Sequence, residues 1–383
     1  MAADQDPLDL KQPKQWLFFD EIKYYRRVVV AVQFKNISLM KNVALLCVVF
    51  AHCSMFFIEK NPFWMLFASE KSMFAIKAIF FMSYVIIPLF MFASGFLLAK
   101  SCEKAGGKLS GLFVKRVKRL LGPYLLTGLI WLVPLYTWFD IACYNRPAGT
   151  SLSGGYQAFL SGMFTDHLWF LLVLFWVDVF FILLFPLFRK SWLAGAGFSL
   201  AAVWLIQEFL QAFPYYKLDQ TALPILSALF GILAYRARAL AEPQRSSRQR
   251  IFAGALLVLV SLFLYYDRGN IYLGWAISIA GCLLFYFLST MFVRTKIAAV
   301  IIYSRGYKWM EKQGMKYYLL HMPFPYLIFL GFYSRLHLSP LLFMLLNLAG
   351  TLAATTLVVW LLDRGNALWN RSRASKDVCC PER

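Results

Sequence analysis

Two ionisable side chains stand eleven residues apart in the first long apolar segment of the chain, at Lys41 and His52. In an α-helix eleven residues turn through about 1100°, roughly 20° past three full turns, so both side chains share one face. They are then about 16 Å apart along the helix axis. A histidine titrates near neutral pH and can serve as a general base or a nucleophile. Taken alone, the pattern favours a boundary lysine and a core histidine bonded to a neighbouring helix.

A basic segment further along the chain contains Arg116 and Arg119, which are spaced one helical turn apart. A short helix would aim both guanidinium groups in the same direction, and arginine suits paired hydrogen bonds to phosphate. A basic cluster that only meets anionic lipid is an equal alternative. Before this segment, the apolar run 74–99 contains Ser94 and Gly95 near its end. Ser94 would offer a hydroxyl there unless it only bonds its own helix, and Gly95 would let two backbones approach closely.

The elements that must position these residues follow from the composition, which is apolar and poor in charge. Of 383 residues, 60% are hydrophobic and 15% are charged, against about 25% charged in an average soluble protein. This excludes a disordered chain and argues against a soluble enzyme. The formal net charge is +20, but the charges form short clusters between long apolar runs. We therefore expect membrane lipid, and not nucleic acid, as a partner.

Ten segments are long and apolar enough to be membrane spans, which need about 20 residues each. Helices are expected because lipid leaves no partner for a free backbone N–H or C=O, and the continuous apolar runs argue against a β-barrel. The sequence thus predicts an all-α integral membrane protein with about ten transmembrane helices. The predicted spans are 42–58, 74–99, 121–139, 168–188, 191–209, 219–235, 251–266, 271–293, 316–334 and 340–362.

The distribution of basic residues predicts how these spans are oriented. Ten spans put both termini on one side, and that side holds 32 of the 39 Lys and Arg residues. The positive-inside rule therefore predicts that both termini are cytoplasmic. We expect a cytoplasmic tail over 1–41, a membrane domain over 42–362 and a second cytoplasmic tail over 363–383. The seven cysteines show no disulfide framework and no metal-ligand spacing, so no metal site is expected.

Ionisable residues within the spans are functional candidates, because a charge in hydrocarbon is costly. Asp178, at the centre of the fourth span, is expected to orient a histidine, to meet a hydroxyl or to pair with another charge. His321 lies about 8 Å into its span. His167 is expected at the outer interface, where it meets an acceptor or is only interfacial. Glu208 is expected near the outer end of its span, in contact with water or lipid headgroups.

The predicted orientation points to a ligand for Lys41 and His52. Lys41 would lie at the cytosolic surface, and His52 would lie near the centre of the bilayer. This arrangement suits a long cofactor with an anionic head at the surface and a reactive end inside the membrane. Coenzyme A has that shape.

Five short motifs follow one another between Lys41 and Pro323. They are Lys41 with His52 after ten intervening positions, Ile87-Pro-Leu-Phe-Met-Phe-Ala-Ser94-Gly95-Phe96, Arg116-Val-Lys-Arg119-Leu-Leu-Gly-Pro123-Tyr124, His167-Leu-Trp169-Phe170-Leu and Met315-Lys-Tyr-Tyr318-Leu-Leu-His321-Met-Pro323. In this order they resemble the acyltransferase 3 family of integral-membrane enzymes, which acylate sugars and lipids. Two positions depart from the family pattern. Ser38 stands where an acidic residue is often found, and Gly314-Met315 stands where the family often has Gly-x-x-Ser.

The resemblance implies an acyl-CoA donor in the cytosol and an acceptor hydroxyl on a cell-surface or lipid-linked glycan. Lys41, Arg116 and Arg119 would hold the phosphates of coenzyme A. Ser94 is assigned to the same donor site. These four residues form the predicted donor-binding set, and no metal is implied.

The predicted catalytic set is His52, Asp178 and His321. His52 would take the proton of the acceptor hydroxyl, or would itself be acylated and relay the acyl group outward. His321 would touch the thioester end of the donor or help to close the site. The sequence leaves the choice between direct transfer and the relay open.

The acyl group and the compartment are also expectations at this point. Acetyl is preferred narrowly over succinyl, which a related branch transfers to periplasmic glucans. The expected location is a bacterial inner membrane. A transporter or flippase is a weaker alternative, because the prolines within the spans do not pair at a constant offset, as repeated halves would require.

Overall fold

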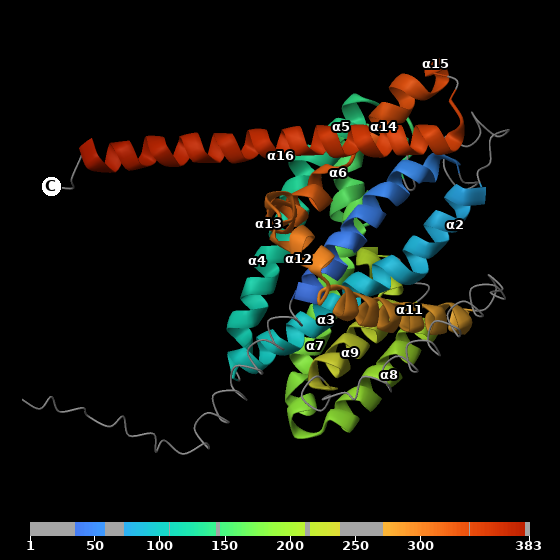
Figure 1. Cartoon of the computed structure of the whole chain (residues 1–383), viewed down its shortest axis with the longest axis vertical. Coiled ribbons are helices and arrows are strands. Elements are labelled where there is room, and N and C mark those ends of the chain that lie inside the picture. Colours follow the sequence, from blue (N-terminus) through green and yellow to red (C-terminus); the bar gives the residue numbers. More distant parts are fainter. Residues whose placement is uncertain are drawn as a thin grey trace, which may run out of the picture.

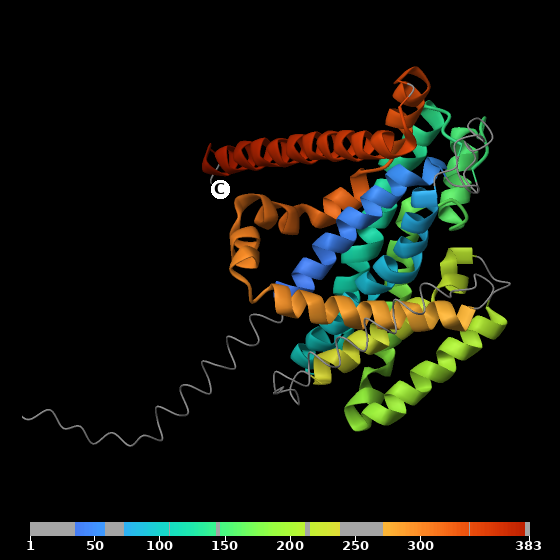
Figure 2. The same cartoon turned by 45° about the vertical axis from the view of Figure 1, so that its right-hand side comes forward.

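The structure is a computed structural model, and it describes residues 35–57, 73–106, 108–142, 146–210, 215–237, 271–336 and 338–379. Within these ranges the regular elements are helices, and no strand is formed. Figures 1 and 2 show a body of packed helices from which one long helix, α16 (Pro340–Cys379), projects. The prediction of an all-α protein is therefore confirmed.

In the described part of the chain, eight helices are long and apolar enough to cross a membrane. They correspond to eight of the predicted spans. The predicted span 316–334 matches a shorter apolar stretch, Phe324–Tyr333, and the predicted span 251–266 lies outside the described residues. The total number of spans and the cytoplasmic position of the termini stay predictions. The eight helices are Lys35–Phe57, Lys77–Ala105, Leu109–Trp138, Asp166–Lys190, Trp192–Phe209, Tyr215–Ala237, Leu273–Phe292 and Pro340–Asn370.

The body is built from the helix Lys35–Phe57, which we call the first helix, and from the helices that pack around it (Figure 1). Buried Leu, Phe and Ile side chains from most of these helices form one large core, and Ala298, Ile302 and Tyr307 form a second, small cluster. The other helices used below are α2 (Met73–Phe81), α3 (Ile87–Ala105), α4 (Leu109–Thr127), α5 (Val133–Trp138), α6 (Leu152–Leu160), α7 (Trp169–Lys190), α8 (Trp192–Phe209), α9 (Ala222–Ala237), α11 (Ile271–Phe292), α12 (Lys296–Tyr303), α13 (Arg305–Leu320), α14 (Phe324–Ile328) and α15 (Ser334–Leu336).

Two glycines let α3 and α9 pack with their backbones in contact. A Cβ atom at Gly95 of α3 would lie 2.1 Å from the carbonyl oxygen of Ala228. A Cβ atom at Gly231 of α9 would lie 2.0 Å from the carbonyl oxygen of Phe92. Real side chains cannot approach that closely, so both positions require glycine. Gly95 therefore has the packing role that small residues commonly have between membrane helices.

Two of the spans contain a π-helical turn just before a proline. One turn, Met82–Ile86, precedes Pro88, and the other, Gly128–Leu132, precedes Pro134. Proline has no N–H, and its ring clashes with the carbonyl four residues back, so the hydrogen-bond ladder shifts there. Both turns lie near the site described below. Met82 lines its cleft, and the Trp131 indole N–H donates to the carbonyl of Met322, 2.6 Å away.

The long helix α16 packs its first half against α13 and α14, and its second half extends away from the body (Figures 1 and 2). A row of polar side chains faces the body. Asn347 donates to the carbonyl of Pro325 at 3.2 Å, and Thr351 donates to the side-chain oxygen of Asn347 at 3.2 Å. Further along, Asp363 accepts hydrogen bonds from Gln313 and Lys316 of α13. The predicted tail 363–383 thus begins inside a helix that holds α13.

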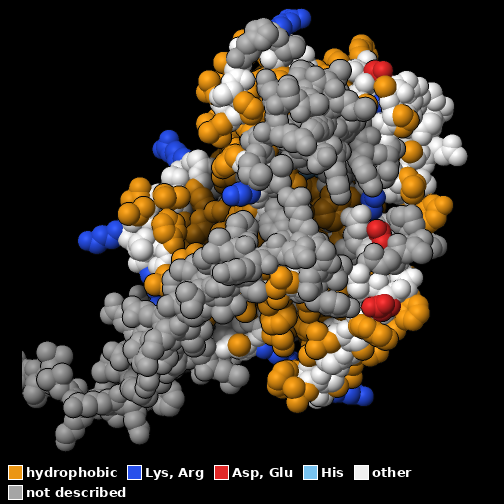
Figure 3. All heavy atoms as spheres, turned by 90° about the vertical axis from the view of Figure 1, so that its right-hand side faces the viewer, with side chains coloured by type: hydrophobic (Ala, Val, Ile, Leu, Met, Phe, Trp, Pro, Cys, Tyr) orange, Lys and Arg blue, Asp and Glu red, His pale blue; other side chains and the backbone are white. Residues whose placement is uncertain are grey.

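The outward faces of the helices are apolar, as contact with lipid requires. Ile130, Leu183 and Val300 are each exposed over more than two thirds of their surface, at 68%, 73% and 74%. Figure 3 shows one face of the molecule, where hydrophobic side chains cover much of the described surface and Lys and Arg stand singly. In a soluble protein such a surface would aggregate. It fits a protein whose helices are surrounded by hydrocarbon.

Candidate active site

Three histidines from distant parts of the described chain meet inside the helix body. His52 comes from the first helix, His167 from the turn before α7, and His321 from the C-terminal end of α13. Nδ1 of His52 and Nε2 of His321 are 3.0 Å apart. The ring of His167 lies 4.9 Å from that of His321 and 6.4 Å from that of His52, centre to centre. The two predicted catalytic histidines are therefore in direct contact.

The hydrogen-bond partners of His321 assign the tautomers of this pair. Nδ1 of His321 lies 2.9 Å from the carbonyl oxygen of Tyr318 and 3.1 Å from that of Tyr317. A carbonyl only accepts, so Nδ1 carries the proton, and Nε2 of a neutral His321 has the lone pair. Nδ1 of His52 must then donate to that lone pair. Nε2 of His52 is left with a free lone pair, which is what a base or a nucleophile needs.

A clasp of two hydrogen bonds connects His167 to the end of α13. Nε2 of His167 lies 3.1 Å from the carbonyl oxygen of Leu319, and the hydroxyl of Tyr318 donates to the carbonyl of His167. The clasp closes on the residues that immediately precede His321. It therefore fixes the backbone whose carbonyls orient His321. His167 is buried, with only 2% of its surface exposed, so its side chain faces the helix body. Its predicted position at the outer interface of the membrane stays a prediction.

Asp166 holds His167 from the other side, and it is not among the site residues that the sequence predicts. Its carboxylate lies 3.5 Å from Nδ1 of His167 and accepts a hydrogen bond from the hydroxyl of Tyr136 at 2.5 Å. Asp166 has a φ of 40°, in the left-handed region that residues other than glycine rarely adopt. Such strain persists where the surrounding contacts require it. The signal available in the sequence was the Asp-His pair directly ahead of Leu-Trp-Phe-Leu.

A narrow cleft opens beside His52 and His167. Its remaining walls are mostly aliphatic and aromatic, and Tyr318 contributes a hydroxyl-bearing ring. Among the described residues that line it there is no Lys, Arg, Asp or Glu. The lining residues are Val48, His52, Met82, Ile87, Phe90, His167, Trp169, Phe170 and Tyr318.

The predicted donor-binding cations come together away from the histidines, at the first helix and α4. The charges of Arg116 and Arg119 on α4 both act on the ammonium group of Lys41. Lys41 precedes His52 by three turns of the first helix, so the cations and the reactive end are separated as the helical spacing predicts. Ser94 is half-buried on α3, one turn beyond Phe90 of the cleft lining and on the side toward the C-terminal end of that helix.

Asp178 contacts one of these cations, and the structure shows no contact between it and a histidine among the described residues. Its carboxylate lies 3.2 Å from Nη1 of Arg116, and its side chain is almost completely buried. Of the three roles expected for Asp178, the structure therefore shows the charge pair. Removing one partner of a buried pair leaves an uncompensated charge, which costs about 3–5 kcal/mol.

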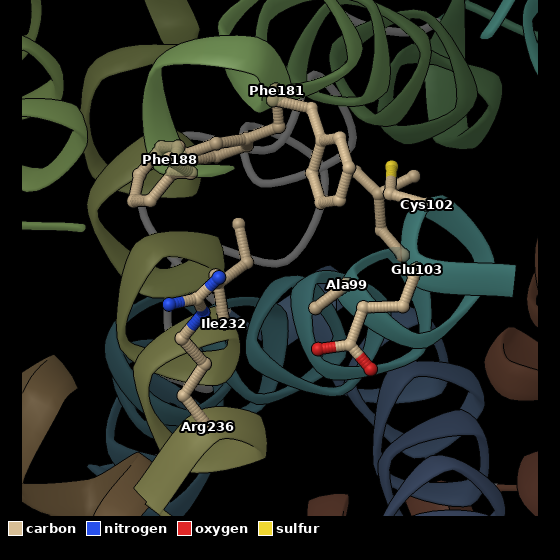
Figure 4. A pocket seen from close by; sticks show the side chains of 9 residues that line it. Ala99, Cys102, Glu103, Phe181, Phe188, Ile232 and Arg236 are labelled. Atoms are coloured by element: carbon tan, nitrogen blue, oxygen red, sulfur yellow. The ribbon is translucent and has the colours of Figure 1, made fainter. Parts of the chain in front are cut away.

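A second pocket lies between α3, α7 and α9 and contains none of the predicted site residues. Its walls are apolar and include Phe181 and Phe188, and Glu103 and Arg236 extend toward it from α3 and α9 (Figure 4). The carboxylate of Glu103 accepts a hydrogen bond from the hydroxyl of Tyr235 at 2.7 Å. No group of His, Cys, Asp and Glu within the described ranges has a metal-binding arrangement.

The family model of the acyltransferase 3 family, described as an acyltransferase domain, matches residues 34–364 of this chain. The chain therefore belongs to the acyltransferase 3 family, and with its apolar helices it is a membrane acyltransferase. The resemblance carried by the five sequence motifs is thereby confirmed. A search of curated proteins and a search of solved structures gave no significant match.

Proposed function

We propose that the protein transfers an acetyl group from cytosolic acetyl-CoA to a hydroxyl of a cell-surface or lipid-linked glycan at the inner membrane of a bacterium. The observation that carries this proposal is the hydrogen-bonded pair of His52 and His321, which leaves Nε2 of His52 as a base beside a cleft. A glycan hydroxyl needs such a base to attack a thioester at neutral pH.

The donor site is supported by the position of the three cations relative to His52. Arg116, Arg119 and Lys41 present positive charge where the phosphates of coenzyme A would lie. The axial rise of about 16 Å between Lys41 and His52 is similar to the length of the pantetheine arm. The thioester would then reach the cleft, with Ser94 along the way.

The chemical step follows from the assigned tautomers. Nε2 of His52 removes the proton of the acceptor hydroxyl while the hydroxyl oxygen forms a bond to the thioester carbonyl carbon. The carbon–sulfur bond then breaks, and the thiolate of coenzyme A takes the proton from His52. His321 accepts the hydrogen bond from Nδ1 of His52 and so stabilises the imidazolium that forms in between. A general base of this kind contributes about 10²–10⁴-fold to the rate.

The same lone pair could first attack the thioester, so the acyl-histidine relay uses the same residues. In that route Nε2 of His52 bonds to the carbonyl carbon, the carbon–sulfur bond breaks and coenzyme A leaves as the thiolate. The acceptor hydroxyl later displaces the imidazole from the acyl carbon, and its proton goes to that thiolate. The two routes differ in whether an acyl group stays on the protein in the absence of acceptor. Mass spectrometry of the protein after incubation with acetyl-CoA alone distinguishes them.

The lining of the cleft favours an uncharged acyl group. Succinyl carries a carboxylate, which in this cleft would be buried without a lysine or arginine partner among the described residues. His167 is not available to pair with that carboxylate, because its two ring nitrogens already contact the carbonyl of Leu319 and the carboxylate of Asp166. Burying an unpaired carboxylate costs several kcal/mol, so acetyl is preferred over succinyl.

Glycan analysis of cells with and without the gene tests this proposal. We expect surface or lipid-linked glycans of the wild-type cells to carry base-labile acetyl groups that are missing in the deletion strain. Complementation with the wild-type gene should restore them, and the His52→Ala gene should not. Loss of succinyl groups, or glycans that are identical in both strains, would contradict the proposal.

A further inference from the structure

Contacts at three levels connect the first helix to α13, and these levels occur in the same order along both helices. Nearest the N-terminal ends, Ser38 donates a hydrogen bond to the carboxylate of Glu311. In the middle, a Cβ atom at Gly314 would lie 3.6 Å from Leu45. At the far end, His52 meets His321. The two helices therefore run in the same sense along the path from the donor cations to the reactive histidines.

Glu311 brings a negative charge to the cations at the start of this path. Its charge acts on the ammonium group of Lys41, opposite in sign to the charges of Arg116 and Arg119. Ser38 lies one turn before Lys41 on the same helix and holds the carboxylate of Glu311 there. The hydroxyl of Tyr307, also on α13, lies 3.3 Å from Ser38 Oγ and adds a second contact at this point.

The three cations of the donor site require a nearby anion. Lys41, Arg116 and Arg119 would repel one another if no anion separated them. Asp178 compensates Arg116, to which it is directly paired. Glu311 contacts Ser38, one turn before Lys41, and its charge acts on Lys41. The five groups together carry three positive and two negative charges, so the cluster still attracts an anionic ligand.

We propose that Glu311 is a positioning residue of the donor site, which reaches across from α13 through Ser38 and holds the ammonium group of Lys41 in place for the phosphates of the donor. This inference rests on the proposed donor site. It adds a residue that the sequence motifs do not contain. An acidic residue is often found in the family at the position of Ser38. Here Ser38 supplies no carboxylate of its own but holds that of Glu311 one turn before Lys41.

The test moves the carboxylate from one helix to the other. Glu311→Gln should raise the apparent KM for acetyl-CoA about two- to fivefold, the size of effect expected from one exposed charge close to Lys41, with kcat little changed. In the double variant Ser38→Asp with Glu311→Gln, the new carboxylate lies one turn from Lys41, and the KM should return close to the wild-type value. Glu208→Gln removes an exposed carboxylate of α8 and should leave the KM unchanged.

A binding measurement separates failure of this inference from failure of the proposed function. The dissociation constant of coenzyme A is measured by calorimetry for the purified wild type and the same variants. Failure of the wild type to bind coenzyme A would contradict the donor site itself. If the wild type binds but Glu311→Gln binds equally well, the assignment of Glu311 is wrong. The assignment is also wrong if Glu311→Gln weakens binding and the double variant does not restore it.

Discussion

His52 and His321 have different tasks although they are chemically alike. His52 lines the cleft and keeps a free lone pair on Nε2, whereas both nitrogens of His321 have partners. The arrangement is comparable to that of a histidine oriented by a carboxylate in a catalytic triad, with a second imidazole in place of the carboxylate. The task of His321 is thus to fix the tautomer of His52.

The first prediction concerns this orienting role. His321→Ala should lower kcat about 10²–10⁴-fold, because His52 loses the acceptor that fixes its tautomer. The apparent KM for acetyl-CoA should change little, since the donor cations lie at the other end of the first helix. Steady-state kinetics of the purified protein measure both values. His337→Ala, which removes a histidine that has no assigned role, is the control and should behave as the wild type.

The second prediction separates the structural and functional roles of Arg116. Asp178→Leu alone should destabilise the protein by about 3–5 kcal/mol, because Arg116 becomes an unpaired buried charge. Arg116→Met together with Asp178→Leu should recover most of that loss but should still raise the KM for acetyl-CoA. Thermal unfolding in detergent measures the first effect and kinetics the second. A double variant with a wild-type KM would show that Arg116 only stabilises the fold.

At the residue scale, the sequence identifies candidate site residues better than it identifies the residues that contact them. The spacing of Lys41 and His52 depends on a single helix, so helical geometry is enough to place it. The clasp at His167 and the role of Glu311 depend on contacts between segments far apart in the chain. The strained turn at Asp166 has no periodic pattern that could reveal it. Charge pairs such as that of Asp178 have the same limitation.

At the scale of elements, the close packing of α3 on α9 is the feature most sensitive to single substitutions. Gly95 belongs to the same motif as Ser94, yet its structural effect is to bring α3 against α9. That contact fixes the helix that carries Phe90 and Ser94 beside the first helix. A change at Gly95 is therefore expected to act through packing.

The third prediction is that Gly95→Ala destabilises the protein by about 1–3 kcal/mol, the usual effect of overpacking. The new methyl group would lie 2.1 Å from the carbonyl oxygen of Ala228, which is backbone and cannot move aside. Gly111→Ala on α4 is the matched control, because nothing lies within 4 Å of its Cβ position. It should be neutral or slightly stabilising. Equal unfolding temperatures for both variants would contradict the packing role.

The sequence predicts the elements themselves well and their details less well. Eight spans follow from hydrophobic length alone, since lipid permits few alternatives to a helix. The π-helical turns before Pro88 and Pro134 are not predicted, because a shifted hydrogen-bond ladder leaves the apolar pattern intact. The end of α16 is also missed. Polar residues after 362 indicate the end of a span, but the helix itself continues to Cys379.

At the scale of the whole molecule, the distribution of Lys and Arg predicts from which side of the membrane the donor reaches the site. The predicted topology puts 32 of the 39 Lys and Arg residues on one side, together with the cations of the proposed donor site and both termini. Because acyl-CoA is a cytosolic compound, the proposed donor site predicts that this side is the cytoplasm. The cleft beside His52 lies deeper, where an acceptor can approach from the membrane or from the other side.

The fourth prediction tests this orientation by cysteine labelling in intact cells. A variant that keeps only Cys379 and Cys380 should react with a membrane-impermeant maleimide only after the cells are permeabilised. A variant in which Ala148→Cys supplies the only cysteine should react in intact cells, because Ala148 is exposed in the loop before α6. The reverse pattern would place the donor cations outside the cell and contradict the use of cytosolic acyl-CoA.

The central claim is that this membrane acyltransferase uses His52 to transfer an acetyl group from acetyl-CoA. The most direct measurement is the transfer of radiolabelled acetyl from acetyl-CoA to glycan in liposomes that contain the purified protein. We predict transfer by the wild type. His52→Ala should show no transfer above background, although it is inserted and elutes as a folded protein in detergent. Full transfer by His52→Ala would contradict the account.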